Sequence, residues 1–104
     1  TLTSMANLAS TYWNQERWKE AEKLEVQVME TRKRVLGEEH PSTLTSMNNL
    51  AFTLKSQSRD EEALSLLVTC FQLHKQVLGE QHPHTRSSLA TLDVWQAENS
   101  KVDL

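Results

Sequence analysis

The chain has very little of what usually marks a secreted, membrane-spanning or catalytic protein. Its single cysteine, Cys70, excludes an internal disulfide framework and is typical of a reducing compartment, so we expect a cytoplasmic location. No apolar run approaches the roughly 18 residues that a membrane span needs, and no charged-then-apolar leader marks the chain for secretion. Because the chain opens with Thr1 rather than Met, we expect it to be a segment of a longer protein.

An excess of basic residues is also absent. The formal net charge is −3 and the sequence pI is about 5.8. A domain that binds duplex nucleic acid normally shows a basic excess, because phosphate neutralisation supplies much of its affinity. We therefore expect neither nucleic acid nor a membrane as a partner. A hydrophobic fraction of 38% and a charged fraction of 24% are typical of a soluble, folded domain.

Glycine and proline are almost as scarce as cysteine, and their positions reveal an internal repeat. The chain has two of each, and each pair is separated by 42 residues: Gly37 and Gly79, Pro41 and Pro83. More than half of the positions in 1–42 are identical in 43–84, and a third copy begins at Thr85 and decays quickly. Such a period indicates a repeat architecture in which each copy is one supersecondary unit.

Within each repeat the hydrophobic spacing is helical. The first apolar stripe falls on one broad helical face, and the second copy has the same stripe. A second helical stripe follows after a short polar stretch, which indicates a hairpin of two helices. One hairpin cannot bury both of its faces, so we expect the copies to stack. The first stripe consists of Leu2, Met5, Leu8, Ala9 and Tyr12.

These patterns predict the following organisation. The first repeat, 1–42, has helix A at 1–14 and helix B at 17–36. The second repeat, 43–84, has helix A at 43–56 and helix B at 59–78. The remainder, 85–104, is a partial third repeat or a capping helix, with Leu89, Leu92 and Trp95 available to pack on the second hairpin.

Local signals predict how these helices begin and end. The pattern Ser58-x-x-Glu61 predicts a capping box at the start of the second helix B. Gly37 and Gly79 are expected to end both B helices as C-cap residues in the left-handed region. The prolines that follow suit the first turn of the next helix, where a missing N–H costs nothing.

The residues of the repeat resemble tetratricopeptide repeats, specifically the 42-residue variety of kinesin light chains and of some nucleotide-binding, immune-receptor-like proteins. The matches in the first copy are Thr-Leu…Asn-Leu-Ala…Tyr, Glu-Ala…Leu and Val-Leu-Gly…His-Pro, and the second copy gives nearly the same set. The resemblance implies an all-α fold: a right-handed α-α superhelix, or solenoid, of about two and a half tandem helical hairpins. One departure is that Glu16 and Ser58 replace a turn glycine that is usual in the family.

The resemblance also implies that the A helices line a concave groove that binds an extended peptide. By resemblance, Asn7 and Asn49 would clamp the peptide backbone, since an amide side chain both donates and accepts hydrogen bonds. The alternative is that each Asn only contacts the neighbouring repeat, and that Trp13 and Phe52 pack against adjacent helices. The predicted concave-face residues are Thr3, Asn7, Ser10, Trp13, Thr45, Asn48, Asn49, Phe52 and Lys55.

Signals of catalysis or metal binding are weak. His82-x-His84 is a local histidine pair, but no Cys or carboxylate stands at a recognised zinc spacing from it. His40 and His82 recur with the repeat, which favours packing or first-turn capping in the linkers. Cys70 takes the place of Val28 in the second copy, which favours a core role over a nucleophilic one. We therefore expect no enzyme activity, no metal and no cofactor.

Two functions remain. The first is a protein–protein interaction module that binds an extended peptide segment of a partner in the concave groove. The alternative is a structural or sensor segment of a longer repeat array in a signalling or scaffold protein, which self-associates through its exposed ends.

Overall fold

The computed structural model describes residues 2–102, and the side chains of residue 5 and of residues 7–98. Within that part the chain forms five α-helices and no strand. Their bounds are α1 Leu2–Asn14, α2 Trp18–Leu36, α3 Pro41–Ser56, α4 Asp60–Leu78 and α5 Pro83–Val102. None of these helices is long and apolar enough to cross a lipid bilayer.

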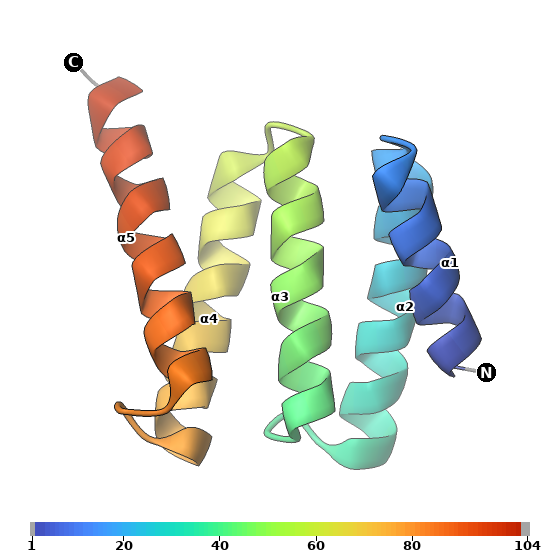
Figure 1. Ribbon diagram of the computed structural model, residues 1–104, viewed down its shortest axis with the longest axis horizontal. Helices are drawn as coiled ribbons and strands as arrows, with labels where there is room; N and C mark the ends of the chain where they lie inside the picture. The colour runs from blue at the N-terminus through green and yellow to red at the C-terminus, as the bar shows by residue number, and fades with distance from the viewer. Residues whose placement is uncertain (1, 103–104) are drawn as a thin grey trace.

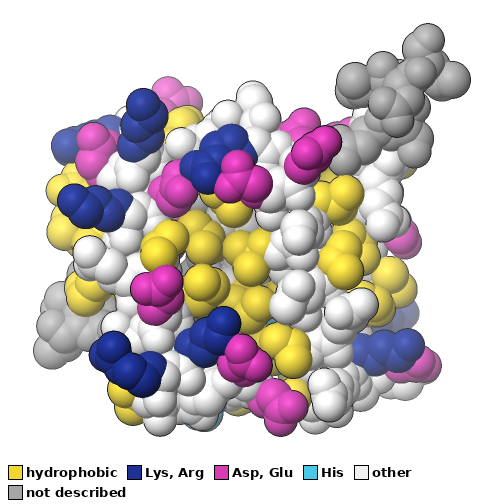
Figure 2. Space-filling model, turned by 180° about the vertical axis from the view of Figure 1, so that it is seen from behind, with side chains coloured by type: hydrophobic (Ala, Val, Ile, Leu, Met, Phe, Trp, Pro, Cys, Tyr) yellow, Lys and Arg dark blue, Asp and Glu magenta, His cyan; other side chains and the backbone are white. Residues whose placement is uncertain are grey.

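The helices stack in chain order as an all-α solenoid. Each helix packs mainly on the one that follows it, as is usual for repeat proteins whose units contact only their neighbours. Figure 1 shows α1, α3 and α5 side by side on the near face, with α2 and α4 behind them. The stack measures 44 × 32 × 19 Å. On the back of the molecule, hydrophobic side chains gather in the middle and charged side chains surround them (Figure 2).

Both hairpins turn through the same helix-ending motif. In the first, the Arg17 N–H donates to the Tyr12 carbonyl (2.8 Å) and the Glu16 N–H donates to the Trp13 carbonyl (3.0 Å). This is the Schellman pattern, which places one residue in the left-handed region. That residue is Glu16 (φ 60°) in the first hairpin and Ser58 (φ 62°) in the second.

The capping box predicted at Ser58 is wrong. Ser58 lies in the left-handed turn, so Arg59 is the N-cap residue of α4 and makes no side-chain cap bond. Arg59 instead donates to two carboxylates, Glu22 of α2 (2.6 Å) and Glu62 of α4. The turn is therefore tied to the preceding hairpin by a charged contact in addition to its backbone bonds.

The linkers between hairpins are also alike. Gly37 (φ 97°, ψ 159°) and Gly79 (φ 89°, ψ 162°) end the B helices with positive φ, as predicted. Their ψ values, however, place them in an extended region that is essentially glycine-only, and not in the left-handed helical region.

The predicted first-turn capping by histidine is confirmed. Nδ1 of His40 accepts a hydrogen bond from the Ser42 N–H, and Nδ1 of His82 accepts one from the His84 N–H, both at 3.1 Å.

The placement of Pro41 and Pro83 in the first turn of the next helix is confirmed, but the helix bounds drawn from repeat identity begin too late. Helix α3 begins at Pro41 and not at 43, and α5 begins at Pro83 and not at 85. The repeat boundary drawn from sequence identity falls two residues inside the helix. The reason is that proline, with its φ already near the helical value, serves as the first helical residue after the capping histidine.

The core lies between the stacked hairpins. Small residues are buried where the two helices of a hairpin approach closely, including Ala21 and Ala63, each with no exposed surface. Cys70 is also fully buried, and burial raises the pKa of its thiol to about 11. The predicted core role of Cys70 is confirmed, since a neutral buried thiol behaves as a small hydrophobic side chain.

Helix α5 packs on α4 with one of its faces. Leu92 and Trp95 are buried there, as predicted, but Leu89 is exposed. Leu89 occupies the repeat position of Met47, which is buried in the second hairpin. Val94, on the same helix, is exposed as well.

Candidate functional site

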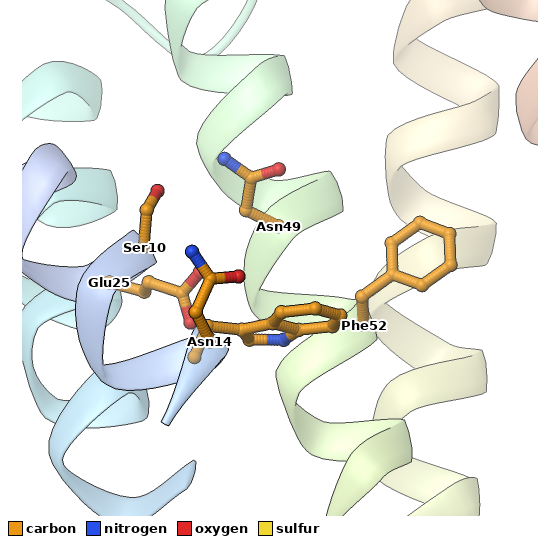
Figure 3. Close-up of a pocket in the computed structure, with 6 residues that line it drawn as sticks. Ser10, Asn14, Glu25, Asn49 and Phe52 are labelled. Carbon is orange, nitrogen blue, oxygen red and sulfur yellow. The ribbon is translucent and has the colours of Figure 1, made fainter. Parts of the chain in front are cut away.

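A hollow of about 320 Å³ lies between α1 and α3. Figure 3 shows how it is built, with Ser10 and Asn14 on α1, Asn49 and Phe52 on α3, and Glu25 reaching it from α2. We call this the large hollow. It forms because α1 and α3 are neighbours that do not pack closely on each other, and both rest on α2. Its lining residues are Ser10, Trp13, Asn14, Glu25, Asn49 and Phe52.

A second, smaller hollow of about 90 Å³ adjoins the first. The two share Ser10, Glu25 and Asn49, so they form one continuous depression along the seam between α1 and α3. Asn7 and Asn49, the pair expected to clamp a peptide, both line this small hollow. Its lining residues are Asn7, Ala9, Ser10, Glu25, Val28, Arg32, Ser46 and Asn49.

The two aromatic side chains of the large hollow are each supported on one side and open on the other. Trp13 meets Trp18 edge to face with ring centroids 5.1 Å apart, and Phe52 meets Trp95 in the same way at 5.3 Å. Yet 39% of Trp13 and 38% of Phe52 remain exposed. Each ring therefore packs against an adjacent helix, as the alternative expected, and also keeps an exposed side. A neighbouring aromatic fixes each ring, and its free side supplies contact area at low entropic cost.

Glu25 was not among the predicted site residues. Its carboxylate accepts a hydrogen bond from the Thr53 hydroxyl of α3, and it lines both hollows. Burial raises the pKa of Glu25 to about 7; the Thr53 bond lowers it and the nearby charge of Glu22 raises it further. Glu25 interrupts the apolar stripe of helix B, and that interruption is the sequence signal that could have found it.

Arg32 was missed as well. It lies on α2 two turns after Glu25, and its Nη1 atom donates to the Ser42 carbonyl (3.1 Å) and to Ser46 Oγ (2.8 Å). These bonds tie α2 to the first half of α3. In the sequence, Arg32 belongs to a basic run on a charged helix, so its spacing gave no sign that this side chain turns inward.

The remaining predicted residues lie outside both hollows. Lys55 is partly buried and pairs with Glu98 of α5 (2.8 Å) and Asp60 of α4 (3.4 Å), which directs its charge toward α5. Thr45 and Asn48 line a separate hollow of about 160 Å³ toward α5, together with His74, His84, Ser87 and Ser88. The side chain of Thr3 lies outside the described residues.

The histidines do not gather with acidic or thiol ligands in a metal-binding geometry. Among the described residues, no three His, Cys, Asp or Glu side chains are placed to hold a metal ion together. His74 is buried and its Nδ1 lies 3.0 Å from Ser88 Oγ, while His82 caps α5. Burial lowers the pKa of His74, with smaller contributions from His84 and His82.

The comparisons with known proteins agree with this geometry. The family model described as Tetratricopeptide repeat matches the chain twice, over residues 1–42 and 43–84. The chain belongs to the tetratricopeptide repeat family. The search of curated proteins found no match. This family is generally non-enzymatic and mediates protein–protein interactions, so the chain is a protein-interaction repeat module.

Solved tetratricopeptide repeat structures identify the type of repeat. A crystal structure of a Podosopora anserina protein described as a kinesin light chain, with nearly identical TPR-like repeats, superposes with a TM-score of 0.84 at 29% identity. BtubC (BKLC) from P. vanneervenii superposes with a TM-score of 0.86 at 22% identity. Both matches cover 98% of this chain, and they cover 48% and 40% of the other chains. The repeats are thus of the kinesin-light-chain type, and the chain spans less than half the length of these relatives.

Proposed function

We propose that the chain binds an extended peptide segment of a partner protein along the seam between α1 and α3. The observation that carries this proposal is the large hollow itself. It brings four predicted site residues, Ser10, Trp13, Asn49 and Phe52, together around one open depression. The small hollow adds Asn7 beside Asn49.

The side chains of this seam suit a peptide main chain. Asn7 and Asn49 are both exposed, and an amide can accept from a peptide N–H while donating to a peptide carbonyl. The half-open rings of Trp13 and Phe52 supply contact area for peptide side chains. Helical-repeat grooves of this kind are preformed. The protein would therefore lose little conformational entropy when a peptide binds, and the affinity would be reduced only slightly by that loss.

A peptide-display selection on the purified chain tests the proposal. Wild type is compared with the double variant Asn7→Ala/Asn49→Ala, and with a control, Gln27→Ala/Gln72→Ala, which removes two exposed amides from α2 and α4 outside both hollows. We expect a consensus peptide for the wild type and the control, and its loss in the seam variant. Equal enrichment by the seam variant would place the binding surface elsewhere.

A second function is supported by the ends of the stack. Leu8 on α1 is 44% exposed and Val94 on α5 is 56% exposed, so apolar side chains face solvent at both outer helices. This supports the alternative of a structural or sensor segment that self-associates through its ends. Sedimentation velocity at several concentrations distinguishes the two. A concentration-dependent oligomer that Val94→Lys abolishes supports end association, and a monomer at all concentrations contradicts it.

A further inference from the structure

Among the described residues that line the large hollow, Glu25 is the one charged side chain, and no basic side chain in the described part of the chain pairs with it. The other lining residues are neutral amides, a hydroxyl and aromatic rings. None of the ion pairs within the described residues includes Glu25. Its hydrogen-bond partner is the neutral hydroxyl of Thr53, whose single proton also lies within reach of the Asn49 carbonyl (3.1 Å) as a second acceptor.

Two other carboxylates of the stack have cationic partners. Glu22, one turn earlier on α2, accepts from Gln57 Nε2 (2.7 Å) and from the guanidinium of Arg59 (2.6 Å). Glu98 on α5 pairs with Lys55. Arg32 lines the small hollow together with Glu25, but its Nη1 atom donates to the Ser42 carbonyl and to Ser46 Oγ. Glu22 and Glu98 thus each have a cationic partner, whereas Glu25 faces the depression without one among the described residues.

We propose that the large hollow receives the cationic end of a Lys or Arg side chain from the partner peptide, with Glu25 as its acceptor. This inference rests on the proposed function, since the cation arrives on a peptide bound along the seam. A cation restores the charge balance of a carboxylate that is partly buried without a counter-ion. The aromatic walls add to the preference, because Trp and Phe rings attract cations at their faces and accommodate aliphatic stems.

The same features disfavour an acidic side chain at this position. A second carboxylate in the hollow would face Glu25 across a partly desolvated space, where like charges repel more strongly than in bulk water. Specificity would then come from both attraction of the basic residue and rejection of the acidic one. The seam as a whole would select extended peptides with a basic residue at one fixed position.

The display selection tests this when it is repeated with Glu25→Gln. Gln is nearly isosteric with Glu and its carbonyl oxygen still accepts from Thr53, so the fold is preserved, which a melting curve verifies. Glu30→Gln is the control, because it removes an exposed carboxylate elsewhere on the same helix. We expect wild type and Glu30→Gln to enrich Lys or Arg at one position. We expect Glu25→Gln to keep the rest of the consensus and lose that preference.

The outcomes separate the inference from the function it rests on. A wild-type consensus without a basic position, or a basic position that Glu25→Gln retains, overturns the cation site and leaves the peptide-binding function intact. A selection that enriches nothing on the wild type overturns both.

Binding constants then give the magnitude. The probes are the peptide most enriched by wild type and the same peptide with its basic residue replaced by Gln, each measured on wild type and on Glu25→Gln. We expect the basic peptide to bind wild type about tenfold more tightly than its Gln form, and the two peptides to bind Glu25→Gln equally. A double-mutant cycle without coupling between Glu25 and the peptide residue would overturn the assignment.

The pH dependence provides an independent readout. The charged groups near Glu25 are Glu22 and Arg32, both on α2, while the lining residues from α1 and α3 are not titratable in this range. With a pKa of about 7, Glu25 is mostly protonated at pH 6 and mostly ionised at pH 8. We expect the basic peptide to bind up to about tenfold more tightly at pH 8 than at pH 6, and Glu25→Gln to show no such change. A flat profile for the wild type would contradict the role of Glu25.

Discussion

Helix α2 packs against α1 and α3 in the same way that α4 packs against α3 and α5, so the molecule contains two equivalent junctions. The first junction has Glu25 on its B helix, and Thr53 of the next A helix donates to it. At the same repeat positions, the second junction has Leu67 and Trp95, which are both buried in the main hydrophobic cluster. A polar pair in one junction is thus replaced by an apolar pair in the other.

A second pair of positions is polar in both junctions. Arg32 donates to Ser46 in the first junction (2.8 Å), and at the equivalent positions His74 lies 3.0 Å from Ser88 in the second. The backbone arrangement and this tie between helices are therefore shared. The difference teaches that equivalent backbone positions hold different environments: the first junction has a carboxylate and a hydroxyl where the second is filled by Leu67 and the indole of Trp95.

The largest expected effect comes from placing the acid of the first junction in the second. Leu67 has no exposed surface. In its junction the repeat position of Thr53 is occupied by Trp95, which has no hydroxyl to donate to a carboxylate. We expect Leu67→Glu to lower the free energy of unfolding by about 4 kcal/mol, because it buries a carboxyl without a partner. Urea denaturation followed by circular dichroism measures this.

The reverse change in the first junction provides the control. We expect Glu25→Leu to cost less than about 1 kcal/mol, since Thr53 keeps its bond to the Asn49 carbonyl. If Leu67→Glu and Glu25→Leu lowered the free energy of unfolding by similar amounts, the two junctions would not differ in their tolerance of a carboxylate, and the comparison would be wrong.

An intermediate effect is expected from the charge of Glu25 itself. Its pKa is raised from 4.5 to about 7 in the folded protein, so the folded state binds more protons than the unfolded state between these values. Stability linked to Glu25 is therefore full below about pH 4.5 and is lost as the pH rises through 7. We expect Glu25→Gln to stabilise the protein by about 1–2 kcal/mol more at pH 8 than at pH 5, a figure reduced for partial solvent screening.

Urea denaturation of wild type and Glu25→Gln at the two pH values checks this. Leu67→Ala, which lies at the same position of the second junction and carries no titratable group, should show no such pH-dependent difference from wild type. An equal gain for Glu25→Gln at both pH values would show that Glu25 titrates normally in the folded state.

The smallest effect is expected where the two halves agree most closely. Glu16 and Ser58 both have positive φ in the hairpin turns, a conformation that costs a residue with a Cβ about 1 kcal/mol. Because glycine adopts it freely but loses more entropy on folding, we expect Glu16→Gly and Ser58→Gly each to stabilise by about 0.5 kcal/mol. Thermal melts of the two single variants measure the gain in stability. A lower melting temperature for either variant would contradict the expectation that positive φ strains Glu16 and Ser58 alike.

Much of the fold could be predicted from the sequence because glycine and proline recur at the boundaries of each repeat. The paired glycines and prolines, and the apolar stripes between them, predict the hairpins directly. The missed details are local. The capping box at Ser58 matched a pattern, but the Schellman turn required that residue for its left-handed position. The prolines correctly marked the first turns of α3 and α5, but the helix bounds taken from repeat identity began two residues late, since identity between copies does not mark a cap.

The candidate site could be predicted only in part. The outward positions of helix A give Ser10, Trp13, Asn49 and Phe52, because helical periodicity fixes which face they share. Lys55 shares that face in the sequence, yet its charge is directed to Glu98 on α5. No periodicity in α3 could reveal that pairing, since it depends on how far apart two separate helices lie.

The sequence alone determined the helical hairpin as the repeating unit and the need for hairpins to stack, because one hairpin cannot bury both of its apolar faces. The resemblance of its motifs to a known repeat implied the all-α solenoid and the family. The tertiary structure decided what lies between the hairpins. Glu25, an interruption in an apolar stripe, becomes a partly buried carboxylate beside Thr53 because α2 packs under both α1 and α3. The distance between non-consecutive helices determined that environment, and it is a property of the stack that no single repeat encodes.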